Sequence, residues 1–142
     1  FLDHGLMRNL ELDPELVRGR LAEEMLKYEG IYMVYTSGQM QSAEYTEGIA
    51  AILQNGYNQK RSGDLLLVPS PAHTDYMNTG TTHGSPYIYD THVPLIFFGR
   101  GIRRGSTTKP TYIRDIAPTL AVMLGIAFPN GSTGTPIQEV LE

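Results

Sequence analysis

The sequence predicts an α/β fold, with a mixed sheet flanked by helices. Two short apolar runs, at residues 65–68 and 95–98, predict the central strands, because a continuous apolar run is typical of a strand buried on both faces. Two longer segments, at residues 14–28 and 115–124, place apolar side chains at helical spacing and predict the flanking helices. At 142 residues, the chain is long enough for a single domain with a buried core.

The first long helix has clear signals at both ends. Asp13 is a suitable N-cap, and Pro14 suits the first helical position because its fixed φ matches the helix. Gly30 offers a stop signal at the other end. The apolar side chains that recur at helical spacing between these signals are Val17, Leu21, Met25 and Tyr28.

Residues 31–36 are rich in β-branched and aromatic side chains and predict a strand. A second, shorter helix is expected from Glu47 to about Leu53. A polar turn at residues 57–64 then leads into the 65–68 strand, which Pro69 ends.

The last helix is expected to begin at Asp115 as its N-cap. Gly125 stands where a left-handed C-cap belongs, because glycine adopts positive φ without steric cost. Residues 134–141 are expected to form a short segment that closes the domain.

The composition excludes several classes of protein. Apolar residues make up 41% of the chain and charged residues 18%, which is typical of an ordered globular domain. A net charge of -4 argues against nucleic acid as a partner. No apolar run approaches the roughly 18 residues of a membrane-spanning helix. The absence of cysteine excludes disulfides and thiolate catalysis.

A long polar loop at residues 69–93 is the strongest candidate for a functional segment, since loops of this length without secondary structure are usually functional. Its candidate metal ligands are His73, Asp75, His83 and His92. A lone loop histidine more often satisfies backbone groups than binds metal. Neutral imidazole is nevertheless a good zinc ligand, and Gly84 after His83 would let the backbone pass close to an ion.

The loop and the segment after it contain a recognisable pattern: His83-Gly84, Tyr89-Asp90, His92-Val93-Pro94 and Gly99-Arg100-Gly101-Ile102. This pattern resembles the last metal-binding segment of the alkaline phosphatase superfamily, with further matches at 60–64, 115–120 and 124–126. The similarity is strongest to the branch of bacterial alkaline phosphatases and type I phosphodiesterases/nucleotide pyrophosphatases. It implies an alkaline phosphatase-like fold, of which residues 1–142 would be the C-terminal part of a larger hydrolase.

The resemblance implies that His83 is a zinc ligand. It also implies a zinc-dependent phosphoester hydrolase, either a phosphatase or a phosphodiesterase, that is periplasmic or secreted and holds two zinc ions. The Ser or Thr nucleophile of the family lies at an earlier helix start, so no catalytic residue and no other cofactor-binding residue is expected within this chain. The chain alone is expected to be inactive, with the N-terminal part of the same polypeptide as its partner and a phosphate ester as the substrate.

The other polar residues of the loop are not expected to bind zinc or to act as nucleophiles. His92 is expected to be a partly buried histidine beneath the 95–98 strand, and Asp90 is expected to orient either His92 or His83, as carboxylates do for metal-bound histidines. His73 and Asp75 are interpreted as surface residues. The hydroxyls next to His83, which are Thr81, Thr82 and Ser85, are not expected to be nucleophiles.

Asp3-His4-Gly5 matches the letters of the family's second zinc-binding pair, but that pair follows a hydrophobic strand and lies much farther upstream. His4 is therefore not expected to bind zinc. The basic cluster after the second apolar run, consisting of Arg100, Arg103, Arg104 and Lys109, is expected to be a solvated turn rather than a substrate site.

Two alternative functions remain open from the sequence. The first is a sulfatase-like or phosphomutase-like enzyme on the same scaffold. The second is a stand-alone domain with a structural metal in the 69–93 loop.

Overall fold

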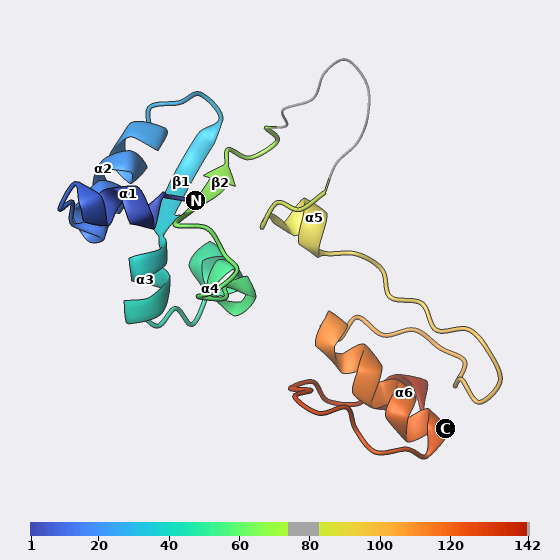
Figure 1. Cartoon of the computed structure of the whole chain (residues 1–142). Helices are drawn as coiled ribbons and strands as arrows, with labels where there is room; N and C mark the ends of the chain where they lie inside the picture. The colour runs from blue at the N-terminus through green and yellow to red at the C-terminus, as the bar shows by residue number, and fades with distance from the viewer. Residues whose placement is uncertain (74–82, 142) are drawn as a thin grey trace. The chain divides into compact units, whose positions relative to one another are not determined.

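The computed structural model describes residues 1–73 and 83–141, in two compact units, Phe1–Val93 and Pro94–Glu142 (Figure 1). The predictions for Asp75, Thr81 and Thr82 lie outside the described residues. No helix among those described is both long and apolar enough to cross a membrane.

The sheet of the first unit consists of two antiparallel strands, β1 (Ile31–Thr36) and β2 (Leu65–Pro69). The predicted α/β class is confirmed, but this sheet is antiparallel rather than mixed. Val68 is 1% exposed and lies in the core, whereas the adjacent Leu67 is 48% exposed. β2 is therefore not buried on both faces as its apolar run predicted.

The described part of the first unit also contains five helices: α1 (His4–Asn9), α2 (Pro14–Met25), α3 (Ser37–Ser42), α4 (Gly48–Gly56) and α5 (Ile88–Thr91). The Asp13 carboxylate accepts a hydrogen bond from the Glu15 backbone N–H at 2.8 Å, so α2 is capped as predicted. α2 packs against β1, while α3 begins directly where β1 ends (Figure 1). Thr36 and Gln39 form a reciprocal capping box at that junction.

The second unit is built on α6 (Ile116–Leu124), preceded by the 3₁₀ turn η1 (Ile113–Asp115). Gly125 has a φ of 63°, which confirms the predicted left-handed cap. The tail carries a second 3₁₀ turn, η2 (Gln138–Val140), and returns to α6, because the Ile137 N–H donates to the buried Thr119 hydroxyl at 2.9 Å. The tail therefore closes this unit.

Asp115 holds the second unit together in a way that the sequence did not predict. Asp115 occupies the N-cap position of α6, as predicted, but its buried carboxylate makes no capping bond to that helix and accepts hydrogen bonds from the backbone N–H groups of Tyr112 and Thr135, both at 2.9 Å. These bonds tie the start of η1 to the tail. Because they favour the charged form, they outweigh desolvation and lower the pKa of Asp115.

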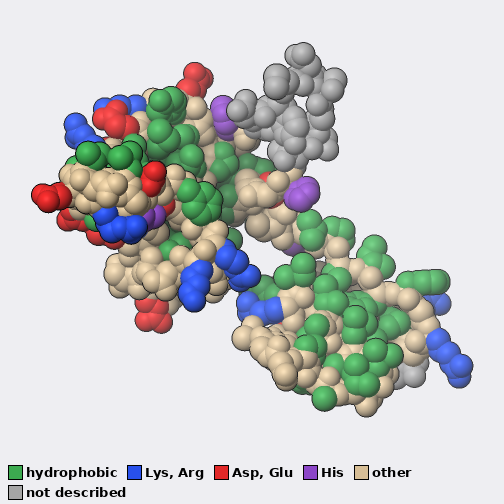
Figure 2. Space-filling model, viewed as in Figure 1, with side chains coloured by type: hydrophobic (Ala, Val, Ile, Leu, Met, Phe, Trp, Pro, Cys, Tyr) green, Lys and Arg blue, Asp and Glu red, His purple; other side chains and the backbone are tan. Residues whose placement is uncertain are grey.

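The predicted strand at residues 95–98 is wrong for this chain. The segment has no regular secondary structure, and the side chains of Ile96 and Phe98 are 82% and 101% exposed. A strand needs a neighbour to satisfy its backbone groups, and within the described residues this segment pairs with none. Its apolar side chains add to the hydrophobic surface of the second unit (Figure 2).

Candidate functional site

His83 lies in the loop that precedes α5, and its side chain is exposed. The next residue, Gly84, has a φ of 115°, a conformation that residues with a Cβ rarely adopt. The glycine beside the candidate ligand is thus required by the backbone path. The chain turns here and enters α5 four residues later.

The Asp90 side chain folds back from α5 onto this turn. Its carboxylate accepts hydrogen bonds from the backbone N–H of Ser85, at 2.9 Å, and from the Ser85 hydroxyl. These two bonds are the main reason why the pKa of Asp90 is lowered, and the nearby His83 and the Gly84 N–H lower it further against the effect of desolvation. Asp90 thus holds the backbone next to His83, through Ser85.

Two tyrosines attach the same segment to the end of β2. The Tyr87 hydroxyl donates to the carbonyl of Pro69 at 2.6 Å, and the Tyr89 hydroxyl accepts from the Ala72 N–H at 3.0 Å. Their rings stack with centroids 5.6 Å apart. Ala72 has a φ of 57°, in the left-handed region that costs a residue with a Cβ roughly 1 kcal/mol. The Tyr89 bond helps to hold this strained residue in place.

The two remaining histidines of the loop have different surroundings. His92 is exposed at the end of α5, where its backbone N–H donates to the Ile88 carbonyl at 2.9 Å. The prediction of a partly buried His92 is wrong, because no strand follows to cover it. His73 lies at the surface, as predicted, with its imidazole against Gly30, where an added Cβ would lie only 2.1 Å from the ring nitrogen Nε2.

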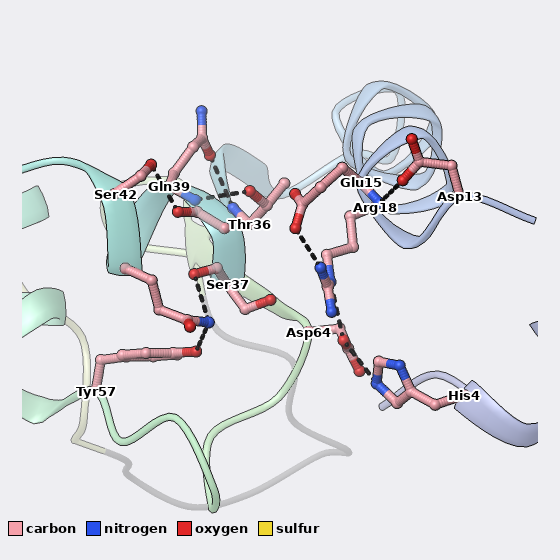
Figure 3. A network of polar contacts seen from close by, with 12 residues as sticks. His4, Asp13, Glu15, Arg18, Thr36, Ser37, Gln39, Ser42, Tyr57 and Asp64 are labelled. Carbon is pink, nitrogen blue, oxygen red and sulfur yellow. Dashed lines mark hydrogen bonds and ion pairs between the residues drawn. The ribbon is translucent and has the colours of Figure 1, made fainter.

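A cluster of charged side chains in the first unit is centred on Asp64, which is 7% exposed (Figure 3). Its carboxylate accepts from the Arg18 guanidinium Nε at 3.0 Å and from the Leu2 N–H at 2.8 Å, and it lies 3.2 Å from His4 Nε2. Burial raises the pKa of Asp64, but the hydrogen bonds from Leu2 and Arg18 and the nearby charges outweigh it, so the pKa is lowered.

This cluster was not predicted from the sequence, since its members are 46 or more positions apart from Asp64. An aspartate in a polar turn carries no local signal that it will be buried. His4 faces Asp64 here, and the interpretation that it does not bind zinc stays a prediction.

The basic cluster after residue 98 is exposed, in agreement with a solvated turn. Lys109 forms an ion pair with Glu139, with 3.0 Å between Nζ and the carboxylate oxygen. The cluster is therefore partly neutralised by the tail of its own unit.

The described residues do not form a complete metal site. No group of three or more histidine, aspartate or glutamate side chains in this part of the chain is placed to hold an ion. A catalytic zinc usually has about three protein ligands. The imidazole of His83 suits zinc chemically, but only as one member of a larger ligand set.

The sequence is similar to known phosphatases over nearly its whole length. It is 34% identical to alkaline phosphatase PafA from Elizabethkingia meningoseptica, over 99% of this chain and 26% of that protein. It is 36% identical to a protein named calcium-transporting ATPase from Myroides odoratus, also over 99% of this chain and 26% of that protein. The chain thus spans about a quarter of the length of these curated relatives. No family model matches the sequence.

Comparison of the fold with solved structures also finds alkaline phosphatase PafA. A crystal structure of wild-type PafA matches all of this chain, and 28% of its own, with a TM-score of 0.90 and 34% sequence identity. The resemblance found in the sequence is therefore confirmed, and the chain belongs to the alkaline phosphatase superfamily. The phosphoryl-transfer relatives also include a 2,3-bisphosphoglycerate-independent phosphoglycerate mutase from Serratia proteamaculans, which is 27% identical over 89% of this chain and 27% of that protein.

Proposed function

We propose that this chain is the C-terminal part of a zinc-dependent phosphoester hydrolase and that it supplies His83 as one zinc ligand. The main support is the similarity to alkaline phosphatase PafA, which extends over the whole chain in both sequence and fold. The local structure agrees with this role, since His83 is exposed on a segment that is held by side-chain hydrogen bonds of Tyr87 and Asp90.

His83 would bind zinc through one nitrogen of its neutral ring. Bound zinc supplies charge stabilisation for the attacking and leaving oxygens of a phosphoryl group. The contribution of this chain is to place the imidazole: Gly84 sets the turn, and Asp90 holds the backbone that follows it.

The remaining ligands and the nucleophile would come from the rest of the polypeptide. The chain spans only about a quarter of its curated relatives, and the described residues contain no group of three metal-binding side chains. We therefore infer no catalysis by this chain alone. From the superfamily we infer two zinc ions in the whole protein and a phosphate ester as its substrate. A periplasmic or secreted location is inferred from the superfamily.

A phosphomutase is the second candidate function. It is favoured by the similarity to the Serratia phosphoglycerate mutase. His83 would bind a metal ion in such an enzyme as well, so the two candidates share the same site. They differ in whether the phosphoryl group goes to water or to another hydroxyl.

The hydrolysis of p-nitrophenyl phosphate in the presence of zinc tests the proposal. The 142-residue chain should show no turnover, whereas the full-length protein should hydrolyse the ester. His83→Ala in the full-length protein should lower turnover by orders of magnitude, because a metal site of about three ligands loses its geometry with one of them. Turnover by the short chain that is abolished by a mutation within it would contradict the proposal. Interconversion of phosphoglycerates without release of phosphate would favour the mutase.

A further inference from the structure

We propose that Tyr87 and Asp90 are positioning residues, which fix the backbone carrying His83 to the end of β2. The inference rests on the proposed zinc role of His83 and adds to it the residues that hold this ligand. It is based on three connected contacts: the Tyr87 bond to β2, the Tyr89 bond to Ala72 and the Asp90 bonds to Ser85.

The first step is the attachment to the sheet. β2 is fixed by its pairing with β1, in which Pro69 lies opposite Ile31. The Tyr87 hydroxyl donates to the carbonyl of Pro69, at the last residue of that strand. The N-cap of α5 is thereby tied directly to the paired end of the sheet.

The second tyrosine makes the attachment two-sided. Tyr89 accepts a hydrogen bond from the Ala72 N–H, three residues beyond the end of β2, and its ring stacks on that of Tyr87. One hydroxyl donates and the other accepts, so the two bonds are made to different points of residues 69–72. Two separated points restrict rotation of α5, which a single bond would leave possible.

The third step connects α5 to His83. α5 has only four residues, and a helix of this length is not stable by itself. Asp90, within α5, accepts hydrogen bonds from both the backbone N–H and the hydroxyl of Ser85, which closes a short loop beginning two residues after His83. The contacts therefore connect Pro69, Tyr87, Asp90 and Ser85, and the backbone continues from Ser85 through Gly84 to His83.

A fixed backbone matters for an exposed metal ligand. Metal ligands must be held close to the geometry that the ion requires, and the outer residues that orient them contribute to affinity. A purely structural role for Tyr87 and Asp90 predicts a loss of thermal stability only. A positioning role predicts, in addition, a loss of zinc affinity.

The experiment measures the zinc dissociation constant of the full-length protein by competition with a chromogenic chelator. Asp90→Ala should weaken binding at one site by about 10–100-fold, the range found for residues that orient metal ligands. Asp90→Asn keeps an acceptor for Ser85 and should lose less zinc affinity than Asp90→Ala. Tyr87→Phe removes only the hydroxyl and should also weaken zinc binding.

Two control variants remove the same groups, a tyrosine hydroxyl and an aspartate carboxylate, at positions outside this segment. Tyr28→Phe removes a hydroxyl from an exposed tyrosine outside this segment. Asp13→Asn removes a carboxylate from the N-cap of α2, where asparagine caps equally well. Both should keep the zinc dissociation constant within about twofold of wild type.

Hydrogen exchange without metal tests the contacts themselves. The Ser85 amide should exchange faster in Asp90→Ala, and the Ala72 amide faster in Tyr89→Phe, than in the controls. Unchanged protection in both would contradict the contacts on which the inference depends.

The outcomes separate this inference from the proposed function. If His83→Ala loses a zinc ion while Asp90→Ala and Tyr87→Phe bind zinc like the controls, the positioning role is wrong and the proposed function stands. If His83→Ala retains all its zinc, the proposed function is wrong and the positioning role falls with it. Lower melting temperatures with unchanged zinc affinity would also overturn the positioning role.

Discussion

In the first unit, Asp64 and Asp90 each lie close to a histidine, and their environments differ. Asp64 is buried, and its carboxylate contacts His4, Arg18 and the Leu2 backbone. Asp90 is half-buried, and its carboxylate accepts hydrogen bonds from the backbone N–H and the hydroxyl of Ser85, two residues after His83.

The two aspartates differ in what their contacts hold together. The partners of Asp64 come from the N-terminal residues, α1 and α2, so its carboxylate joins segments of the fold. The contacts of Asp90 and Tyr87 instead hold a short segment at the end of the sheet. We therefore assign stability to the Asp64 cluster and ligand placement to the Asp90 segment.

The largest expected effect on stability is that of Asp64→Ala. Removing one partner of a buried ion pair costs about 3–5 kcal/mol, because the other charge is left without compensation. Here Arg18, whose side chain is 13% exposed, would keep only its ion pair with the exposed carboxylate of Glu15. Urea denaturation should show this loss, whereas Glu24→Gln, in an exposed pair with Lys27, should change the free energy of unfolding by less than about 1 kcal/mol. Similar losses in both variants would contradict the assignment.

Gly134→Ala should destabilise the second unit and leave zinc binding at His83 unaltered. An added Cβ would lie 2.1 Å from the Arg114 carbonyl oxygen, so the backbone would have to move. Overpacking of this kind costs about 1–3 kcal/mol. The matched control is Gly105→Ala, whose Cβ would meet no atom within 4 Å. Equal melting temperatures for the two variants would show that the tail does not pack as described.

Acid should weaken the Asp64 cluster in a defined direction. The folded pKa of Asp64 is lowered below its ordinary value of 3.8, so its contribution to stability is fully present above that pH and is lost as the pH falls through the folded pKa. Wild type should lose stability below about pH 4 more steeply than Asp64→Asn, which cannot titrate at this position. Parallel pH profiles of the free energy of unfolding would exclude Asp64 as a source of the acid sensitivity.

The smallest expected effect is a gain. Gly19 lies inside α2, next to Arg18, and an added Cβ would meet no atom within 4 Å. Gly19→Ala should raise the free energy of unfolding by about 0.5–1 kcal/mol through higher helix propensity. Zinc affinity should not change, because α2 is assigned to stability alone. A change in zinc affinity would contradict the separate roles assigned to the Asp64 cluster and the Asp90 segment.

The elements that could be predicted from the sequence are those with local signals. α2 was found from Asp13 and Pro14, and the end of α6 from Gly125, because capping depends on neighbouring residues. The failed predictions depended on distant partners. Residues 95–98 resemble a strand in composition, but a strand also needs a neighbouring backbone. Because this strand does not form, the expected burial of His92 beneath it also fails.

In the candidate site, too, local features were predicted and contacts between distant residues were not. His83, Gly84 and Asp90 were recognised because they lie close together in the sequence and match a family pattern. The bond from Tyr87 to Pro69 joins residues 18 positions apart, and those of Asp64 to Arg18 and Leu2 join residues 46 and 62 apart. Such contacts depend on the folded path of the chain and have no signature in the order of residues.

The zinc content of the purified full-length protein tests the central claim most directly. We compare wild type with His83→Ala, His4→Ala and His92→Ala by elemental analysis after removal of loosely bound metal. The account predicts that His83→Ala loses about one zinc ion per molecule, while His4→Ala and His92→Ala retain the wild-type content. Full zinc content in His83→Ala, or the loss of an ion in His92→Ala instead, would contradict it.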